Sequence, residues 1–348
     1  MSSEASSPLR WSEALALAAA RDLRGRRILC TTLGQGQAAA ALAAARPDDR
    51  VTCRLLDEYQ RRQAAADAPP NCEMVVSADA PTGPFDLAVV PIAKRGEAEL
   101  ARDWIQSACQ SLDTGGMLVA TIDNGRDAWL RTVIAGWFDR VGATSDRRGT
   151  TYTARKQRDP RKWKDFRCQF ALRDRGRLLQ AVSRPGVFAH RRTDVGARQL
   201  INGAEPAAGA RILDLGCGSG VVGLALAARD PTCRVHAIDS HARAIECTLA
   251  GAQLNGLANV TAELSSNGPT GPPGQFDLVL TNPPYYSQFA IAQRFLEVAH
   301  AALRPGGQLL VVTKSPEWYL EALAPLWHDV TAEPSKGFAL VRARRSAE

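Results

Sequence analysis

The sequence predicts an α/β protein made of two tandem, doubly wound domains whose sheets are largely parallel. Three observations lead to this fold class. Apolar segments of strand length alternate with segments of helical periodicity along the whole chain. With 348 residues, the chain is too long for one ordinary hydrophobic core. One pattern of strand and glycine turn also occurs twice, at residues 27–36 and again at residues 211–220.

The two copies keep a nearly constant spacing. Residues 50–51 lie 184 positions before residues 234–235, the same distance that separates the two glycine turns. Residues 85–87 lie 191 positions before residues 276–278, so the second copy has gained seven residues. We expect this insertion in the Gly- and Pro-rich loop 267–274, because a longer surface loop costs little free energy. The constant order and spacing favour duplication over a chance likeness between two α/β domains.

The first predicted helix, Trp11–Leu23, is expected to be capped by Ser12 or one of its neighbours. Its apolar stretch, residues 14–20, is too short for a membrane span and lacks the layout of a signal peptide. The eight cysteines are scattered, without a CxxC motif or a His-rich tract, which argues against a zinc site. This cysteine usage is typical of reduced thiols in the cytoplasm. The net charge of +7 and the pI of about 9.1 favour a polyanionic partner.

The copies differ most where polar groups would form a site. The second copy carries Asp214, Gly216, Asp239 and residues 282–285, where the first carries Cys30, Thr32, Leu55 and residues 91–94. We therefore interpret residues 1–158 as a degenerate copy, residues 159–184 as a basic linker with a hairpin, and residues 185–348 as the catalytic domain. Asp57 lies close to the lost acid and could shift into register, which leaves residual ligand binding in the first copy open.

The basic segment at residues 147–177 holds twelve Lys or Arg against three Asp. Residues 166–172 and 178–183 are predicted as two strands joined by the hairpin turn 174–176. The segment has two open interpretations, a solvated linker or a strip that contacts nucleic-acid phosphates. The candidate RNA contacts are Arg161, Lys162, Lys164, Arg191 and Arg192.

A glycine turn links the strand 212–215 to the helix 221–229, and glycines let a ligand approach the backbone closely. Asp239 ends the next strand, where a carboxylate can accept both hydroxyl groups of a ribose. Residues 218–223 satisfy GxGxxG, so a nicotinamide-dependent dehydrogenase is formally possible. Asp214 before the turn, and the motif discussed next, have no role in hydride transfer. S-adenosylmethionine accounts for all of these features.

The most informative residues are Asn282-Pro283-Pro284-Tyr285, which follow the predicted buried strand 276–280. The prolines end the strand, so the motif lies at the carboxyl edge of the sheet, where ligands of open α/β sheets bind. The Asn282 side-chain oxygen and the Pro283 carbonyl can accept the hydrogens of an exocyclic amine. Tyr285 can stack on a flipped base, a contact worth about 1–3 kcal/mol. No step of this reaction needs a metal.

With these motifs, residues 185–345 resemble the class I methyltransferases that carry an NPP[YF] motif and have a Rossmann-like fold. More narrowly, the chain resembles the bacterial 16S ribosomal RNA guanine-N2 methyltransferases of the RsmC type, which also carry a degenerate first copy. The stretches that carry this resemblance are residues 185–188, 193–196, 214–220, 239, 266–267, 282–285 and 337–338. The resemblance implies methyl transfer from S-adenosylmethionine to guanine N2 in ribosomal RNA or the small ribosomal subunit, by a monomer in the cytoplasm.

The implied cofactor residues are Asp194, Asp214, Gly216, Cys217, Gly218, Gly220, Asp239, Ser240, Asn267 and Asn282; the implied catalytic residues are Asn282, Pro283, Pro284 and Tyr285. The family usually has Phe and then His after the prolines, whereas this chain has Tyr285 and Tyr286. Tyrosine at the first position is also what adenine-N6 and protein-glutamine methyltransferases use, so both remain alternatives. A non-catalytic RNA-binding assembly factor is a third hypothesis, which the intact second site disfavours.

Overall fold

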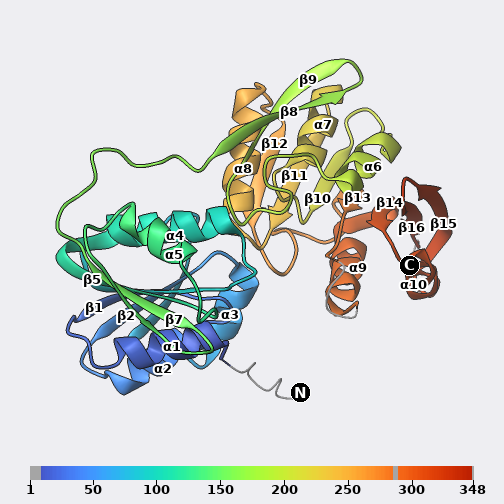
Figure 1. Ribbon diagram of the computed structural model, residues 1–348. Helices are drawn as coiled ribbons and strands as arrows, with labels where there is room; N and C mark the ends of the chain where they lie inside the picture. The colour runs from blue at the N-terminus through green and yellow to red at the C-terminus, as the bar shows by residue number, and fades with distance from the viewer. Residues whose placement is uncertain (1–8, 285–288, 347–348) are drawn as a thin grey trace. The chain divides into compact units, whose positions relative to one another are not determined.

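The computed structural model describes residues 9–284 and 289–346 (Figure 1). The chain divides into two compact units, one ending at Phe166 and the other beginning at Arg167. Each unit holds a seven-stranded sheet, and the second also holds a two-stranded hairpin. Nowhere in the two described stretches is there a helix long and apolar enough to cross a membrane.

The first unit alternates strands and helices as the sequence predicts. Its helices are α1 (Trp11–Ala20), α2 (Gln37–Ala45), α3 (Glu58–Ala66), α4 (Ala98–Ser111) and α5 (Trp129–Ala135). Its strands are β1 (Arg27–Thr31), β2 (Arg50–Leu55), β3 (Cys72–Val76), β4 (Phe85–Ile92), β5 (Leu112–Ile122), β6 (Val141–Ser145) and β7 (Thr150–Arg155).

The second unit begins with the hairpin of β8 (Cys168–Asp174) and β9 (Arg177–Ser183). Its helices are α6 (Val195–Gly203), α7 (Val221–Arg229), α8 (Ala242–Leu254), α9 (Ala290–Ala302) and α10 (Pro316–Leu323). Its strands are β10 (Arg211–Leu215), β11 (Arg234–Asp239), β12 (Val260–Leu264), β13 (Phe276–Thr281), β14 (Leu303–Thr313), β15 (Trp327–Ser335) and β16 (Phe338–Arg345).

Both sheets have the same strand order, which confirms the predicted doubly wound α/β fold. The order is β3-β2-β1-β4-β5-β7-β6 in the first unit and β12-β11-β10-β13-β14-β16-β15 in the second. The first five strands of each sheet pair in parallel, and the last two are antiparallel. The order reverses beside β1 and β10, so a ligand site is expected at the carboxyl end of β10 in the second unit.

Helices cover both faces of each sheet. In the second unit, α6 and α7 pack on one face through a core that includes Ile212 and Leu278. Helices α9 and α10 pack on the other face, against Leu213 and Val279. The alternation of these neighbouring strand residues between faces is the period-two pattern of a sheet buried on both sides. In the first unit, α1 and α2 cover one face and α4 and α5 the other.

The β8–β9 hairpin packs on the second unit, beside α7 and α8 (Figure 1). Leu172 and Leu179 are buried in the core that the hairpin shares with α7. The side-chain amide of Asn255, at the end of α8, extends the edge of β9. Its Oδ1 accepts the Gln180 N–H at 2.9 Å, and its Nδ2 donates to the Gln180 carbonyl at 2.6 Å.

The seven-residue insertion is not confined to the loop 267–274, so that expectation is wrong. Helix α8 has 13 residues where α3 has 9, which places four of the extra residues in a helix. The remaining three fall between β12 and β13, as the longer connection there shows. Extending α8 by one turn keeps its buried face in phase, because a helix repeats every 3.6 residues.

The first helix also differs from its prediction. Helix α1 ends at Ala20 rather than Leu23, and its N-cap is Arg10 rather than Ser12. Glu13 replaces the expected cap, because its carboxylate reaches back to the Arg10 N–H at 3.4 Å. A side chain in the third helical position that bonds back to the cap residue satisfies one of the free N–H groups of the first turn.

Candidate functional site

The glycine turn between β10 and α7 forms the floor of the candidate site. Gly216, Gly218 and Gly220 all have positive φ, of 75°, 56° and 75°, a conformation that side chains disfavour. The Gly216 and Cys217 N–H groups both donate to the Ile238 carbonyl, at 2.9 and 3.0 Å. A Cβ added to Gly218 would meet no atom within 4 Å, so the turn borders open space there.

Asp239, the last residue of β11, faces this turn. Its Oδ2 accepts the Gly218 N–H at 2.8 Å, and its Oδ1 accepts the His241 N–H at 2.9 Å. A carboxylate offers about four lone-pair sites, which suits the predicted contact with ribose hydroxyls; that contact stays a prediction. Ser240 follows directly and begins the connection to α8.

Asp214 lies beneath the turn rather than at its surface. Its side chain is 3% exposed, and its Oδ2 accepts the Gly223 N–H in the first turn of α7 at 2.8 Å. Burial raises the pKa of this carboxyl group to about 7, although the Gly223 N–H opposes the shift. Asp214 thus ties the strand to the helix; its contact with the amino group of a cofactor stays a prediction.

Asn282 directly follows β13, the neighbour of β10 in the sheet. The Thr281 hydroxyl donates to the Leu215 carbonyl at 2.9 Å and so joins the start of the motif to the strand that leads into the glycine turn. Asn282 Nδ2 donates to Asp194 Oδ2 at 3.1 Å. Pro283 and Pro284 leave the strand as predicted, whereas the proposed stacking residue Tyr285 lies outside the described residues.

Asn267 follows β12, two strands from β10, in an exposed loop. Its Oδ1 accepts a hydrogen bond from the Arg294 guanidinium of α9, which also donates to the Ser266 carbonyl at 3.3 Å. Arg294 was not predicted, because a contact between a loop and a helix 27 residues later follows no local pattern in the sequence. Arg294 orders the segment at which the adenine contact was predicted.

Cys217 is buried in the turn, and its Sγ lies 3.4 Å from the Thr248 hydroxyl of α8. Burial raises the pKa of this thiol well above its ordinary value, so it is held as a neutral thiol. A neutral, enclosed thiol packs the turn against α8 and is a poor nucleophile. The contact of Cys217 with a cofactor stays a prediction.

The strand order β12-β11-β10-β13 brings four predicted segments to one edge of the sheet. Parallel neighbours end at the same edge, so one edge of the sheet holds the turn after β10, Asp239, the Ser266-Asn267 pair and Asn282. Asp194, the N-cap of α6, joins them through Asn282. Of the predicted RNA contacts, Arg161, Lys162 and Lys164 belong to the first unit, and Arg191 and Arg192 are exposed in the segment between β9 and α6 of the second.

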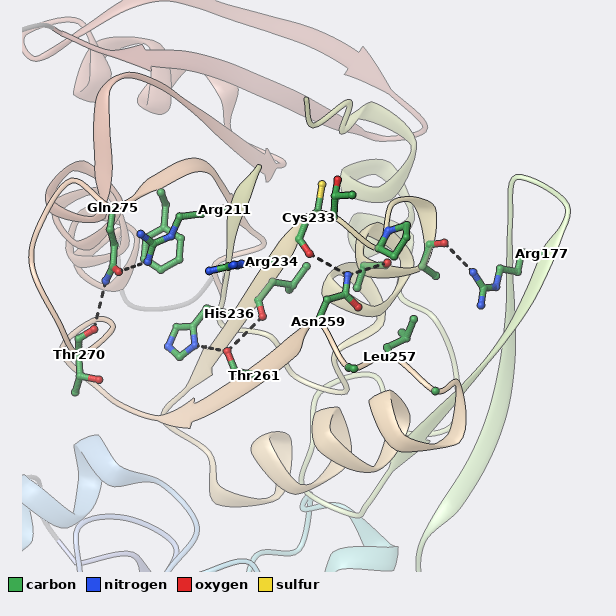
Figure 2. A pocket seen from close by; sticks show the side chains of 18 residues that line it. Arg177, Arg211, Cys233, Arg234, His236, Leu257, Asn259, Thr261, Thr270 and Gln275 are labelled. Atoms are coloured by element: carbon green, nitrogen blue, oxygen red, sulfur yellow. Dashed lines mark hydrogen bonds between the residues drawn. The ribbon is translucent and has the colours of Figure 1, made fainter. Parts of the chain in front are cut away.

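A hollow of about 920 Å³ lies at the other end of the same sheet (Figure 2). Arg211 and Arg234, the first residues of β10 and β11, line it together with Arg177 of β9. It is therefore separate from the predicted site. The basic groups lining it have acidic or polar neighbours, since His236 pairs with Glu263 at 3.1 Å and Arg211 donates to the Gln275 side chain at 2.5 Å.

The corresponding place in the first unit is filled by its own side chains. Glu13 is 1% exposed, and its Oε1 accepts from the Thr32 hydroxyl at 2.8 Å and from the Leu33 N–H at 3.0 Å. The Thr32 hydroxyl in turn accepts the N–H groups of Gly34 and Gly36, both at 3.1 Å. The donors that a ligand could use in this turn are thus already engaged.

The register of the first unit also excludes Asp57 as a replacement acid. Cys30 pairs with Cys53 as Asp214 pairs with Ala237, so Leu55 stands where Asp239 stands in the second unit. Asp57 lies two residues further on and caps α3, where its Oδ1 accepts the Gln60 N–H at 2.9 Å. Across residues 9–284 and 289–346, no group of three or more His, Cys, Asp or Glu side chains could hold a metal ion.

Comparison with known proteins places this arrangement in a family. Residues 179–342 match the family described as "Methyltransferase small domain". The ribosomal RNA small subunit methyltransferase C of Pseudomonas aeruginosa is 34% identical over 176 residues, which cover 48% of this chain and 52% of that protein. The chain thus spans about half the length of that relative. The protein of the same name from Chromohalobacter salexigens is 33% identical over 237 residues, which cover 63% of this chain and 68% of that protein.

Among solved structures, the T. Thermophilus 16S rRNA N2 G1207 methyltransferase (RsmC), in complex with AdoMet and guanosine, has a TM-score of 0.77 to this chain. The likeness covers 96% of this chain and 91% of that one at 20% identity, and it confirms the fold of two tandem Rossmann-like domains. The sequence match to the Chromohalobacter protein carries the assignment beyond the fold. The chain therefore belongs to the ribosomal RNA small subunit methyltransferase C family of class I methyltransferases.

Proposed function

We propose that this chain transfers a methyl group from S-adenosylmethionine to the exocyclic N2 of a guanine in 16S ribosomal RNA. The observation that carries the proposal is the position of Asn282 at the sheet edge that also holds the glycine turn and Asp239. An acceptor for an aromatic amine thus stands beside a fold element suited to an adenosyl ligand. In this proposal residues 185–348 are the catalytic domain, and residues 1–158 are a degenerate copy joined to it by the linker and hairpin.

The residues present fit S-adenosylmethionine. Asp239 faces the glycine turn, where its carboxylate would accept hydrogen bonds from ribose hydroxyls, and the backbone at Gly218 borders open space. Asp214, whose pKa is raised to about 7, would lie near the charged amino-acid end of the ligand. Asn267, held by Arg294, would contact the adenine. When bound, this cofactor supplies an electrophilic methyl group on its sulfonium.

The chain's own contribution is to orient the acceptor. In guanine the lone pair of N2 is delocalised into the ring, which makes the amine a weak nucleophile. Asn282 Oδ1 and the Pro283 carbonyl would accept hydrogen bonds from its two N–H groups and stabilise the positive charge that develops on the nitrogen as it takes up the methyl group. One of the two protons would then be lost to solvent, which leaves a neutral N2-methyl amine. Tyr285 would stack on the base, and proximity supplies the rest of the rate enhancement.

The basic linker is an argument for a ribosomal RNA partner, because its segment around Lys164 is held in place on the first unit. The Lys164 N–H donates to Gln106 Oε1 and the Gln106 Nε2 donates to the Lys164 carbonyl, each at 2.9 Å. Trp163 stacks on Trp137 with ring centroids 5.6 Å apart. Arg161, Lys162 and Lys164 are exposed on this anchored segment. An ordered row of cations loses less conformational entropy when it binds phosphates than a mobile one does.

The test is incubation of the chain with labelled S-adenosylmethionine and small ribosomal subunits from a strain that lacks the modification. Nucleoside mass spectrometry should show N2-methylguanosine. Asn282→Ala should lower the rate by about 10²–10³-fold, by analogy with the loss of other charge-stabilising donors and acceptors, while the cofactor affinity changes little. Methyladenosine would support the adenine-N6 alternative, which Tyr285 favours, and a fully active Asn282→Ala variant would refute the catalytic assignment.

The same material tests the remaining parts of the proposal. Naked 16S RNA and assembled subunits, offered separately, identify the form of the substrate. Light scattering of the purified chain tests whether the working unit is a monomer. Fractionation of cells that produce the chain tests the proposed cytoplasmic location, where the small ribosomal subunit is found.

A further inference from the structure

Asp194 and Asn282, 88 residues apart in the sequence, form a hydrogen bond at the candidate site. We propose that Asp194 is a positioning residue that fixes the side-chain amide of Asn282 in one of its two orientations. This inference rests on the proposed function, because it assigns the orientation of the group that would accept the amine hydrogens. A contact between Asp194 and the cofactor, which the resemblance implied, is not needed for this role.

The chemistry of the pair decides the orientation of the amide. An ionised carboxylate can only accept hydrogen bonds, so the part of the amide that faces Asp194 Oδ2, 3.1 Å away, must be the NH2 group. The oxygen of the amide is then directed away from Asp194. Loss of this acceptor would remove a hydrogen bond that favours the present orientation of the amide over the rotated one.

Asp194 is itself held firmly. It caps α6, and the same Oδ2 atom accepts the N–H groups of Gly196 at 2.8 Å and of Ala197 at 3.4 Å. The positive end of the helix dipole stabilises a negative charge at this position. The Asn282 amide therefore shares an oxygen with two backbone donors of one helix, and its position follows the start of that helix.

Gly196 provides the space for this contact. A Cβ at position 196 would lie 2.9 Å from Asn282 Nδ2, closer than Cβ atoms approach other atoms in proteins, and 3.1 Å from Asn282 Cγ, which is tighter than most Cβ contacts. Any side chain there would displace the amide. Since Gly196 does not have a positive φ, close approach rather than backbone conformation is the reason for a glycine at this position.

The first unit supplies an internal comparison, because all three members of this group are replaced there together. At the corresponding positions it carries Arg10, Ser12 and Pro91. Helix α1 nevertheless begins at the position equivalent to the start of α6, with Glu13 as its backbone acceptor. An aspartate is thus dispensable for starting this helix, and Asp194 accompanies the asparagine that it contacts.

The consequence is a selection among acceptor groups. With Nδ2 bound to Asp194, the Asn282 oxygen is directed away from the carboxylate, and an oxygen in that place can accept a hydrogen bond from an amine. A rotated amide would offer N–H groups instead, which suit a carbonyl edge. Guanine presents both an amine and a carbonyl, so Asp194 would favour the orientation of the base that brings its amine to the methyl donor.

The experiment replaces Asp194 in the full chain. At saturating S-adenosylmethionine and RNA, Asp194→Ala should lower kcat by about 10- to 100-fold, as expected for a misplaced catalytic group. The dissociation constant of S-adenosylmethionine should change less than about twofold. Asp194→Asn, whose Oδ1 can accept the same donors, should restore much of the rate. Asp57→Ala is the matched control. Asp57 also caps a helix, but it belongs to the first unit, whereas Asp194 and Asn282 belong to the second.

Two outcomes would overturn the proposal. If Asp194→Ala weakens cofactor binding but leaves kcat at the parental value, Asp194 is a cofactor contact. If the fold losses in kcat from Asp194→Ala and Asn282→Ala multiply in the double variant, the two residues act independently, against the proposal. If the two residues act as one unit, the double variant should be no slower than Asn282→Ala alone.

A readout without catalysis separates this inference from the proposed function. In the ligand-free chain, the side-chain NH2 resonances of Asn282 should shift in Asp194→Ala and in Gly196→Ala, but not in Asp57→Ala. Shifts without any methyl transfer by the parent chain would reject the proposed function alone. Unshifted resonances would reject the positioning role, whatever the activity.

Discussion

Arg229, the last residue of α7, connects the β8–β9 hairpin to the rest of the second unit. Its guanidinium forms a bidentate ion pair with Asp174, with Nε 2.8 Å from Oδ2 and Nη2 3.0 Å from Oδ1. It also donates to the carbonyls of Ala204 at 2.7 Å and Ile201 at 2.6 Å, at the end of α6. Arg229→Ala would remove one side chain that joins three elements.

The expected cost follows from the burial of this pair. The side chains of Arg229 and Asp174 are only 9% and 7% exposed. Arg229 holds the pKa of Asp174 below its ordinary value, so the variant would leave an ionised carboxylate enclosed without its partner. Removing one member of a buried pair costs about 3–5 kcal/mol. The double variant Arg229→Met with Asp174→Leu should recover most of this loss, because two apolar side chains leave no unpaired charge.

The assay is urea denaturation of residues 167–348, followed by the fluorescence of Trp318 and Trp327. Arg175→Ala is the matched control, because Arg175 lies in the same hairpin and its pair with Glu205 is exposed. It should leave the free energy of unfolding unchanged. A fragment of residues 185–348 lacks the hairpin and should be less stable than 167–348. A loss below about 1 kcal/mol for Arg229→Ala, or equal stability of the two fragments, would refute the reasoning.

Three further predictions concern the site and the linker. Burial raises the pKa of Asp214 to about 7, so folding takes up a proton at this group between about pH 4 and 7. The free energy of unfolding of the parent therefore falls as pH rises through this range, because the buried carboxyl must ionise. Asp214→Asn should therefore gain stability relative to the parent over that window, by about 1–3 kcal/mol, in urea titrations at several pH values. Gly220→Ala places a Cβ 2.6 Å from the Thr248 hydroxyl and should abolish the thermal stabilisation by S-adenosylmethionine, whereas Gly256→Ala, whose Cβ meets nothing within 4 Å, should retain it. Replacing three linker cations by alanine should lower the magnitude of the slope of log affinity for RNA against log salt concentration by about 2–3 and leave the cofactor affinity unchanged. The control replaces the same number of exposed arginines elsewhere in the first unit. The three cations are Arg161, Lys162 and Lys164, and the control arginines are Arg21, Arg24 and Arg26.

Much of this fold was predictable because its signals are local. Buried parallel strands read as short apolar runs, and glycines with positive φ mark the turn after β10, as at Gly216 and Gly220. The position of Asn282 followed from two prolines that end a strand. These features depend on a few neighbouring residues, so periodicity and composition identify them.

The contacts that complete the site were not predictable in the same way. Arg294 and Asn267, or Asp194 and Asn282, meet only once the strand order is known. The insertion was misplaced for a related reason. A loop rich in Gly and Pro is the obvious position for extra residues, but a whole turn added to α8 leaves its buried face unchanged and gives no local sign.

Because Glu13 occupies the turn of the first unit, the stability of the two halves of this chain should depend differently on the concentration of a ligand. A turn whose donors are occupied by Glu13 and Thr32 has nothing to gain from a diffusible ligand. The stability of the first half is then set by its sequence alone. If the second half binds a methyl donor, its stability follows the donor's concentration. When the donor is scarce, the second half would lose this added stability, whereas the stability of the first half would stay the same.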